Sequence, residues 1–153
     1  MRAVIKRITR YGAIAVLAAL AVAQVFPIAR DNPPVESEVP TTPEARAILA
    51  RACLDCHSNQ TVWPWYSKVA PVSWLVVKDV REGRKDLNFS TWSMYTAKKQ
   101  RKLLRESLEE VKEGAMPLWI YWVGHPEARL SEADRAVLQA WVDERVAALD
   151  AGP

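Results

Sequence analysis

The pentapeptide Cys53-Leu54-Asp55-Cys56-His57 constrains this chain more than any other feature of its sequence. Cysteines at positions i and i+3 lie one helical turn apart, so each thiol can add to one vinyl group of a haem. The histidine that follows directly can supply a nitrogen to the iron from the proximal side. The spacing therefore predicts one covalently attached haem c, with Cys53 and Cys56 as attachment points and His57 as the proximal iron ligand.

Two other chemistries use closely spaced cysteines. A Cys2His2 zinc site would need both histidines of the chain, His57 and His125. Because His57 directly follows Cys56, these two side chains are poorly placed to occupy two corners of one tetrahedral metal. A redox-active cysteine pair of the thioredoxin type belongs to a strand–helix context, which the sequence does not show. Covalent haem is the prediction, with zinc, a redox dithiol and a chance spacing as the alternatives.

The N-terminal segment has the layout of a sequence directed to a membrane. Residues 1–10 contain four basic and no acidic residues, and an apolar run follows from Tyr11 to Phe26. The run is at the short end for a spanning helix and at the long end for a signal peptide, and small residues before Gln24 offer a cleavage site. We expect a cytoplasmic basic segment over 1–10 and a transmembrane anchor or signal segment over 11–28. The remaining chain would then face the periplasm from the bacterial inner membrane, or be soluble there after cleavage.

The net charge of +3 belongs to this N-terminal segment. Four of the 21 basic residues lie within the first ten positions, so the rest of the chain has 17 basic against 18 acidic residues. A nucleic-acid-binding domain needs a basic surface. Nucleic acid is therefore excluded as a partner, and we expect redox partner proteins at the membrane instead.

The remaining sequence predicts an all-α fold. Residues 29–42 are rich in proline without a helical pattern and are expected to form a tether, and residues 43–153 are expected to form the c-type haem-binding domain. Apolar residues recur there at helical spacing, and no segment alternates as a strand does. Thr42 and Ser131 are expected N-caps, and Gly114 is expected to end a helix. The expected helices cover about residues 43–52, 71–84, 97–113 and 132–146.

The sixth iron ligand is less directly marked than the fifth. Met116 precedes a proline in an aromatic-rich loop between two expected helices, and its thioether would complete the His/Met ligation of electron-transfer cytochromes. His125 is the competing nitrogen ligand, and an open sixth position is the third alternative. The other methionine of the folded part, Met94, can equally belong to the core.

Seven tryptophans are expected to wall the haem and to fill a small core. A domain of about 120 residues has limited apolar surface to bury. Since a haem adds a large apolar body, we expect poor folding without it. Arg84 and Lys85, at the end of an expected helix, are candidate donors to a haem propionate.

Several stretches make the chain similar to a known family. They are Arg30 to Pro34, Cys53 to Asn59, Trp63 to Tyr66, Ala70 to Trp74, Gly83-Arg84, Leu87 to Ser90, Met116-Pro117, Tyr121, His125-Pro126 and Leu130 to Trp141. On these residues the chain resembles the haem-binding domain family of short bacterial proteins, which have an N-terminal membrane segment and one C-x-x-C-H site.

The resemblance implies a periplasm-facing c-type haem protein of cytochrome-c-like helical architecture, preceded by an N-terminal membrane helix. It carries over the two cysteines as attachment points and His57 as the proximal ligand. Met116 and His125 both belong to the family's pattern, so both stay open as the sixth ligand. One departure is Asp79, where many relatives carry a histidine.

The function predicted on these grounds is that of a membrane-tethered periplasmic mono-haem c-type cytochrome. It would transfer electrons between redox partner proteins rather than act as an enzyme. The alternative is a haem-based peroxidase, or a gas or redox sensor, with a labile or open sixth iron position. A haem-stabilised interaction module is a third reading.

Overall fold

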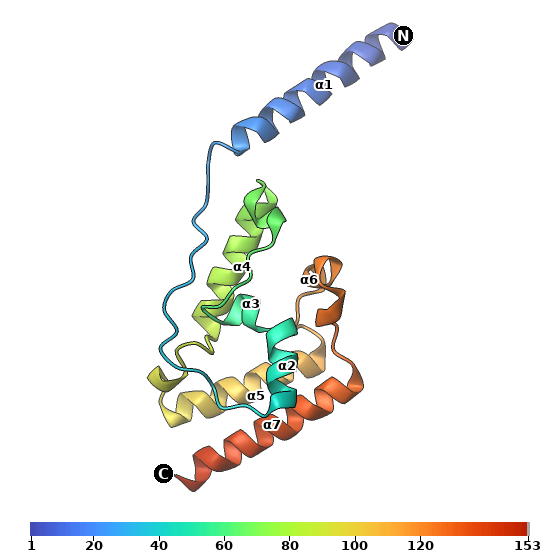
Figure 1. Cartoon of the computed structure of the whole chain (residues 1–153). Coiled ribbons are helices and arrows are strands. Elements are labelled where there is room, and N and C mark those ends of the chain that lie inside the picture. Colours follow the sequence, from blue (N-terminus) through green and yellow to red (C-terminus); the bar gives the residue numbers. More distant parts are fainter. Residues whose placement is uncertain (153) are drawn as a thin grey trace. The chain divides into compact units, whose positions relative to one another are not determined.

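The computed structural model describes residues 1–152 and confirms the all-α prediction (Figure 1). Within these residues there are seven α-helices, three short 3-10 helices and no β-strand longer than an isolated bridge. The helices are α1 Arg2–Ala23, α2 Pro43–Ala52, α3 Leu54–His57, α4 Val72–Asp86, α5 Ala97–Glu113, α6 Trp119–Gly124 and α7 Glu132–Ala151. The 3-10 helices are η1 Trp65–Lys68, η2 Trp92–Met94 and η3 Pro126–Ala128.

Local capping explains where the longer helices begin and end. The Thr42 hydroxyl accepts the Ala45 amide at the start of α2, and Ser131 forms a capping box with Asp134 at the start of α7. Such caps satisfy amides that have no partner inside the helix. Helix α5 ends at Gly114, whose φ of 75° is in the left-handed region that favours glycine. These three predicted boundaries are confirmed.

The described residues form two compact units. The first unit contains residues 1–31 and 63–79, and the second contains residues 32–62 and 80–152. The haem motif lies wholly in the second unit.

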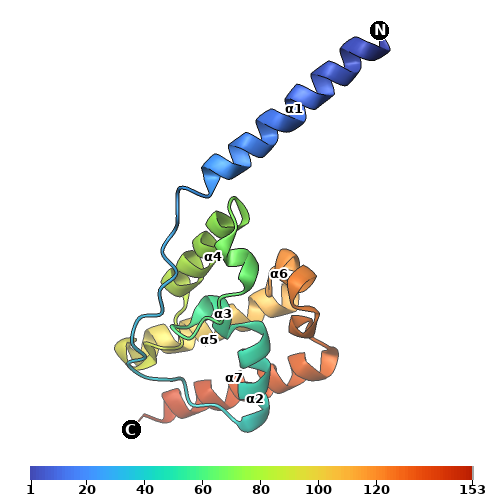
Figure 2. The same ribbon diagram turned by 45° about the horizontal axis from the view of Figure 1, so that its top comes forward.

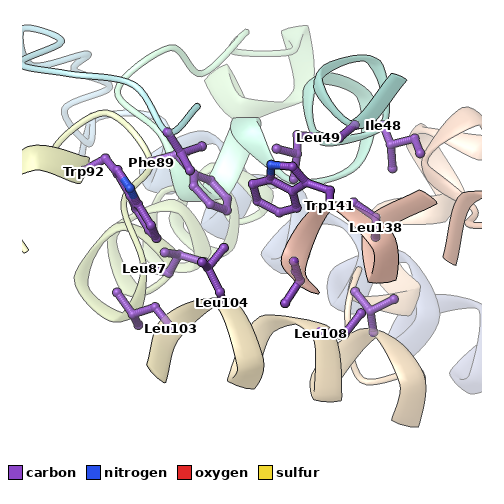
Figure 3. Close-up of a cluster of buried hydrophobic side chains, with 14 of the residues drawn as sticks. Ile48, Leu49, Leu87, Phe89, Trp92, Leu103, Leu104, Leu108, Leu138 and Trp141 are labelled. Carbon is purple, nitrogen blue, oxygen red and sulfur yellow. The ribbon is translucent and has the colours of Figure 1, made fainter. Parts of the chain in front are cut away.

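The core of the second unit is an apolar cluster supplied mainly by α2, α5 and α7 (Figure 3). Helices α5 and α7 lie side by side in both views (Figure 1, Figure 2), and α2 packs against α7. The Phe89 ring lies 6.4 Å from the Trp141 ring and 6.0 Å from the Trp92 ring, centroid to centroid. Each fully buried Leu or Phe contributes about 1.5–3 kcal/mol. Other members of the cluster are Ile48, Leu49, Leu87, Leu103, Leu104, Leu108, Leu138 and Val142.

Residues 29–42 contain no helix, and most of this segment is bonded to the second unit. The backbone amides of Glu36 and Ser37 donate to the Ser90 carbonyl at 2.9 and 3.1 Å. Val39 is buried, and the Pro40 carbonyl accepts the indole N–H of Trp141 at 3.0 Å. From residue 32 on, the prolines therefore belong to an extended path along the folded unit rather than to a free linker.

The expected transmembrane helix over 11–28 is not supported. Helix α1 ends at Ala23, before the apolar run ends at Phe26. Its apolar part, 11–23, would extend about 20 Å, against about 30 Å for a bilayer's hydrocarbon core. Among residues 1–152, no helix has the length and apolar character needed to cross a membrane.

Candidate haem site

The haem motif forms a separate turn directly after α2. Helix α2 ends at Ala52, and α3 begins at Leu54, with Cys53 between the two helices. The Cys53 carbonyl accepts the backbone amides of Cys56 at 3.2 Å and of His57 at 2.9 Å. The three predicted site residues therefore lie on one hydrogen-bonded turn, and both cysteines are half-buried.

Cys53 packs against the apolar core of the second unit. Loss of hydration there raises the pKa of its thiol to about 12, the Cys56 thiol adds to the rise, and Arg51 opposes it. Cys53 is therefore a neutral thiol at pH 7. If a haem is attached here, this S–H group would supply both the sulfur and the hydrogen that add across a vinyl double bond.

The His57 ring is oriented by two backbone carbonyls. Its Nδ1 lies 3.0 Å from the Gly83 oxygen and 3.1 Å from the Leu87 oxygen. Because a carbonyl only accepts, Nδ1 carries the proton and donates, which leaves the Nε2 lone pair for a metal. Burial lowers the pKa of His57, so the ring is neutral at pH 7. This is the protonation state that an iron ligand requires.

Gly83 allows α4 to approach the motif closely. A Cβ built at this position would lie 2.7 Å from the backbone oxygen of Cys56 and 3.1 Å from its Cβ. A backbone oxygen cannot move aside as the end of a flexible side chain can. The contact that brings the Gly83 carbonyl to His57 therefore requires a glycine.

Arg84 fixes the segment that follows the motif. Its Nε donates to the Ser58 carbonyl at 2.7 Å, and its Nη2 donates to Asn32 Oδ1 at 2.8 Å and to Thr61 Oγ1 at 2.9 Å. The guanidinium, expected as a donor to a propionate, is thus engaged with protein oxygens. A planar group with five donors suits this role because it binds several oxygens at once.

Asp55, inside the motif, connects it to α6. Its Oδ1 accepts the Val62 amide at 2.8 Å, and its Oδ2 accepts the Tyr121 hydroxyl at 2.7 Å. The Tyr121 ring stacks on the His125 ring, with centroids 4.3 Å apart and planes 16° from parallel. His125 Nδ1 lies 3.2 Å from a carboxylate oxygen of Glu127. Tyr121 therefore contacts both the haem motif and one candidate iron ligand.

Met116 lies between α5 and α6, and its side chain is half-buried. Its backbone amide donates to the Glu110 carbonyl at 3.1 Å, and the proline that follows is buried. In the chain, Met116 precedes α6 and His125 directly follows it. Both candidates for the sixth ligand are thus on the segment that Tyr121 ties to the haem motif.

Sequence reasoning did not identify the contacts of Asp55, Tyr121 and Gly83. Asp55 and Tyr121 are 66 positions apart, and no spacing rule pairs residues so far apart. The signal that was available was an acidic residue between the two cysteines of the motif. The glycine next to Arg84 was noted only as part of the family resemblance.

The zinc alternative finds no support in residues 1–152, which contain no group of three or more His, Cys, Asp or Glu able to hold a metal ion. The residues do fit a haem. Two cysteines lie on one turn, an imidazole presents Nε2, and a glycine makes room for the backbone that orients it.

Comparison with known proteins identifies the family. The chain belongs to the family described as "Haem-binding domain", whose model matches residues 18–144. This confirms the predicted family and supports a haem as the cofactor. No curated protein and no solved structure matches the chain.

Proposed function

We propose that this protein is a mono-haem c-type cytochrome that carries electrons. Cys53 and Cys56 would hold the haem through thioether bonds, and His57 Nε2 would bind the iron. The observation that carries the proposal is the pair of carbonyls, Gly83 and Leu87, which take up Nδ1 of His57. A hydrogen bond to the second ring nitrogen is the usual support of a metal-binding histidine.

Met116 is the proposed sixth ligand, with His125 as the alternative. A carrier needs both axial positions filled, so that the iron changes its oxidation state without binding a substrate. Support for Met116 is its backbone, which is hydrogen-bonded directly after α5, whereas the His125 ring is stacked on Tyr121. The bound haem would supply one-electron redox chemistry, at a potential that a Met ligand raises.

We further propose export to the periplasmic side of the bacterial inner membrane, with redox proteins of that membrane as partners. The support is the order of a basic segment over 1–10 and an apolar run from Tyr11 to Phe26. Mass spectrometry of the chain in both the membrane fraction and the soluble fraction tests this location. A chain that keeps its first 23 residues supports retention at the membrane, and one that begins at Gln24 in the soluble fraction contradicts it.

A haem peroxidase or sensor is the second candidate. The observation that favours it is the pairing of His125 with the Glu127 carboxylate. An imidazole polarised by a carboxylate can act as a general acid or base beside an iron that is open to a small ligand.

The absorption spectrum of the holoprotein separates the two candidates. In a carrier, the haem stays attached to the polypeptide after denaturation. The native protein gives a six-coordinate spectrum that carbon monoxide does not change. Rapid binding of carbon monoxide favours the enzyme or sensor. If expression with a c-type maturation system gives no covalent haem, both proposals fail.

Three single variants then identify the sixth ligand. Met116→Ala should convert the low-spin spectrum to high spin and permit carbon monoxide binding, whereas His125→Ala should change neither. Met94→Ala is the matched control, because Met94 is 71% exposed on η2 and belongs to no candidate site. A high-spin spectrum in His125→Ala alone would assign the ligand to His125.

A further inference from the structure

An exposed apolar surface lies in the first unit. Five apolar side chains from η1, from the residue after it and from the first turns of α4 form this surface, called here the aromatic loop surface. They are Trp65, Val69, Val72, Trp74 and Leu75. Trp65 is 76% exposed and Leu75 is 48% exposed, whereas Ser67 and Ala70 of the same segment are buried. The loop thus buries small residues and presents large apolar ones to its surroundings, which marks an interaction site.

The end of the apolar N-terminal run and the residues that follow it are hydrogen-bonded to the segment that carries this surface. The Gln24 side chain makes two hydrogen bonds with the Ala70 backbone, donating to its carbonyl and accepting its amide, both at 3.0 Å. The Trp74 indole donates to the Phe26 carbonyl at 3.4 Å, and the Arg30 guanidinium donates to the Ser67 carbonyl at 2.9 Å. Hydrogen bonds from residues 24–30 therefore fix the place of the loop relative to the end of the apolar run.

This connection indicates what the surface touches. Where the apolar run enters a lipid layer, residues 24–30 lie at the boundary between acyl chains and head groups. The surface bonded to them must then lie at the same depth. Its two tryptophans are the residue type enriched at that depth, because the indole is apolar with one polar N–H. The exposed Lys68 beside them suits anionic head groups.

We propose that the aromatic loop surface rests in the head-group region of the inner membrane, as a second lipid contact beside the N-terminal run. The proposal depends on the membrane location given under the proposed function. The first unit would then be a lipid-binding unit with two apolar parts that the Gln24–Ala70 pair holds together. The surface itself, and not only the N-terminal run, would bind the protein to lipid.

Nitroxide labels on the full-length holoprotein, in vesicles of phosphatidylethanolamine and phosphatidylglycerol, test the proposal. Single variants Trp65→Cys, Val25→Cys and Met94→Cys carry the label, and the haem thioethers protect the two native cysteines. The three positions are matched in exposure, at 76%, 72% and 71%. For each label, the rate of collisions with oxygen is divided by the rate of collisions with a water-soluble nickel chelate. This ratio rises with the depth of the label in the lipid. We expect this ratio to be about threefold higher at positions 25 and 65 than at 94.

The label at position 25 separates two kinds of failure. If position 25 is in lipid and position 65 gives the same ratio as 94, the aromatic loop surface faces water and the proposal is overturned, while the membrane location stands. If positions 25 and 65 both match 94, the membrane location fails and the surface proposal fails with it. A label at 65 that is shielded equally from oxygen and nickel indicates burial against protein or haem, and this also overturns the proposal.

Discussion

Gly83 lies where helix α4 comes closest to the haem motif, and its missing side chain permits the contact with Cys56. The same residue supplies a carbonyl to Nδ1 of His57. One position therefore combines a steric and an electrostatic requirement of the site. A substitution of Gly83 would therefore change the orientation of His57 without altering the histidine itself.

We expect Gly83→Ala to destabilise the holoprotein by about 1–3 kcal/mol, because overpacking outweighs the gain in helix propensity of about 1 kcal/mol. Urea unfolding and the yield of covalent haem measure the two effects. Gly12→Ala is the control, since a Cβ there meets nothing within 4 Å. Equal stability of the two variants would show that α4 can shift away from Cys56 at no cost.

The Asp134 side chain makes the stability of the folded state depend on pH. The backbone amide of Ser131, with further bonds from Ser131 and Arg51, lowers the pKa of the Asp134 carboxyl. A lowered folded-state pKa contributes stability above the unfolded value of about 3.9, and this is lost as the pH falls through the folded pKa. Asp134→Asn should therefore lower stability at pH 7 and reduce the loss of stability on acidification below pH ~4.

The pH dependence is measured by urea unfolding from pH 3 to 7. Glu132→Gln removes a charge from the same first turn of α7 without touching the capping box, and should leave the acid part of the profile as it is. The interpretation is wrong if Asp134→Asn and Glu132→Gln give the same profile.

At the scale of elements, α6 is the helix that connects the two candidate sixth ligands with the haem motif. Its Tyr121 hydroxyl donates to the Asp55 carboxylate. A hydrogen bond to a charged group contributes about 1.5–3 kcal/mol. The segment from Met116 to His125 should therefore open more readily when this bond is removed.

We expect Tyr121→Phe to raise the rate at which added imidazole displaces the sixth ligand by about tenfold, because about 1.4 kcal/mol corresponds to a factor of ten. Stopped-flow absorption of the ferric protein measures this rate. Ser107→Ala also removes a hydroxyl that donates a hydrogen bond, to the Leu104 carbonyl inside α5, and should leave the rate unchanged. A rate that rises equally in both variants would indicate general destabilisation instead.

Most elements could be predicted from the sequence because their signals are local. Thr42, Gly114 and Ser131 each fix a helix end within a few residues. The contact between Gly83 and Cys56 and the bond between Asp55 and Tyr121 depend on how helices pack, and no local pattern encodes them. Helix α1 was misjudged because apolar character does not fix where a helix ends.

At the scale of the whole molecule, the apolar cluster and the haem motif carry different parts of the stability. The cluster joins α2, α5 and α7 through residues such as Leu104 and Trp141 (Figure 3). It includes Leu54 of the haem motif, and Cys53 packs against it, but among the described residues it includes neither Cys56 nor His57. The expectation that folding depends on haem should therefore hold most strongly for α6, none of whose residues belongs to the cluster.

We expect a Cys53→Ala/Cys56→Ala variant to have no covalent haem and to lose amide protection first in α6. Amides of α5 and α7 should stay protected, because their partners are buried apolar side chains. Hydrogen exchange with mass spectrometry measures both regions, and the holoprotein is the control. Equal loss of protection in all helices would show that the cluster cannot fold without the cofactor.

The two carbonyls that hold Nδ1 of His57 have a consequence for the order of assembly. The imidazole has its tautomer and its direction from the polypeptide itself. When an attachment machinery brings the haem, Nε2 of His57 would therefore already have its orientation. Only the thioether bonds would remain to be made. The iron would gain its first protein ligand without a search through rotamers.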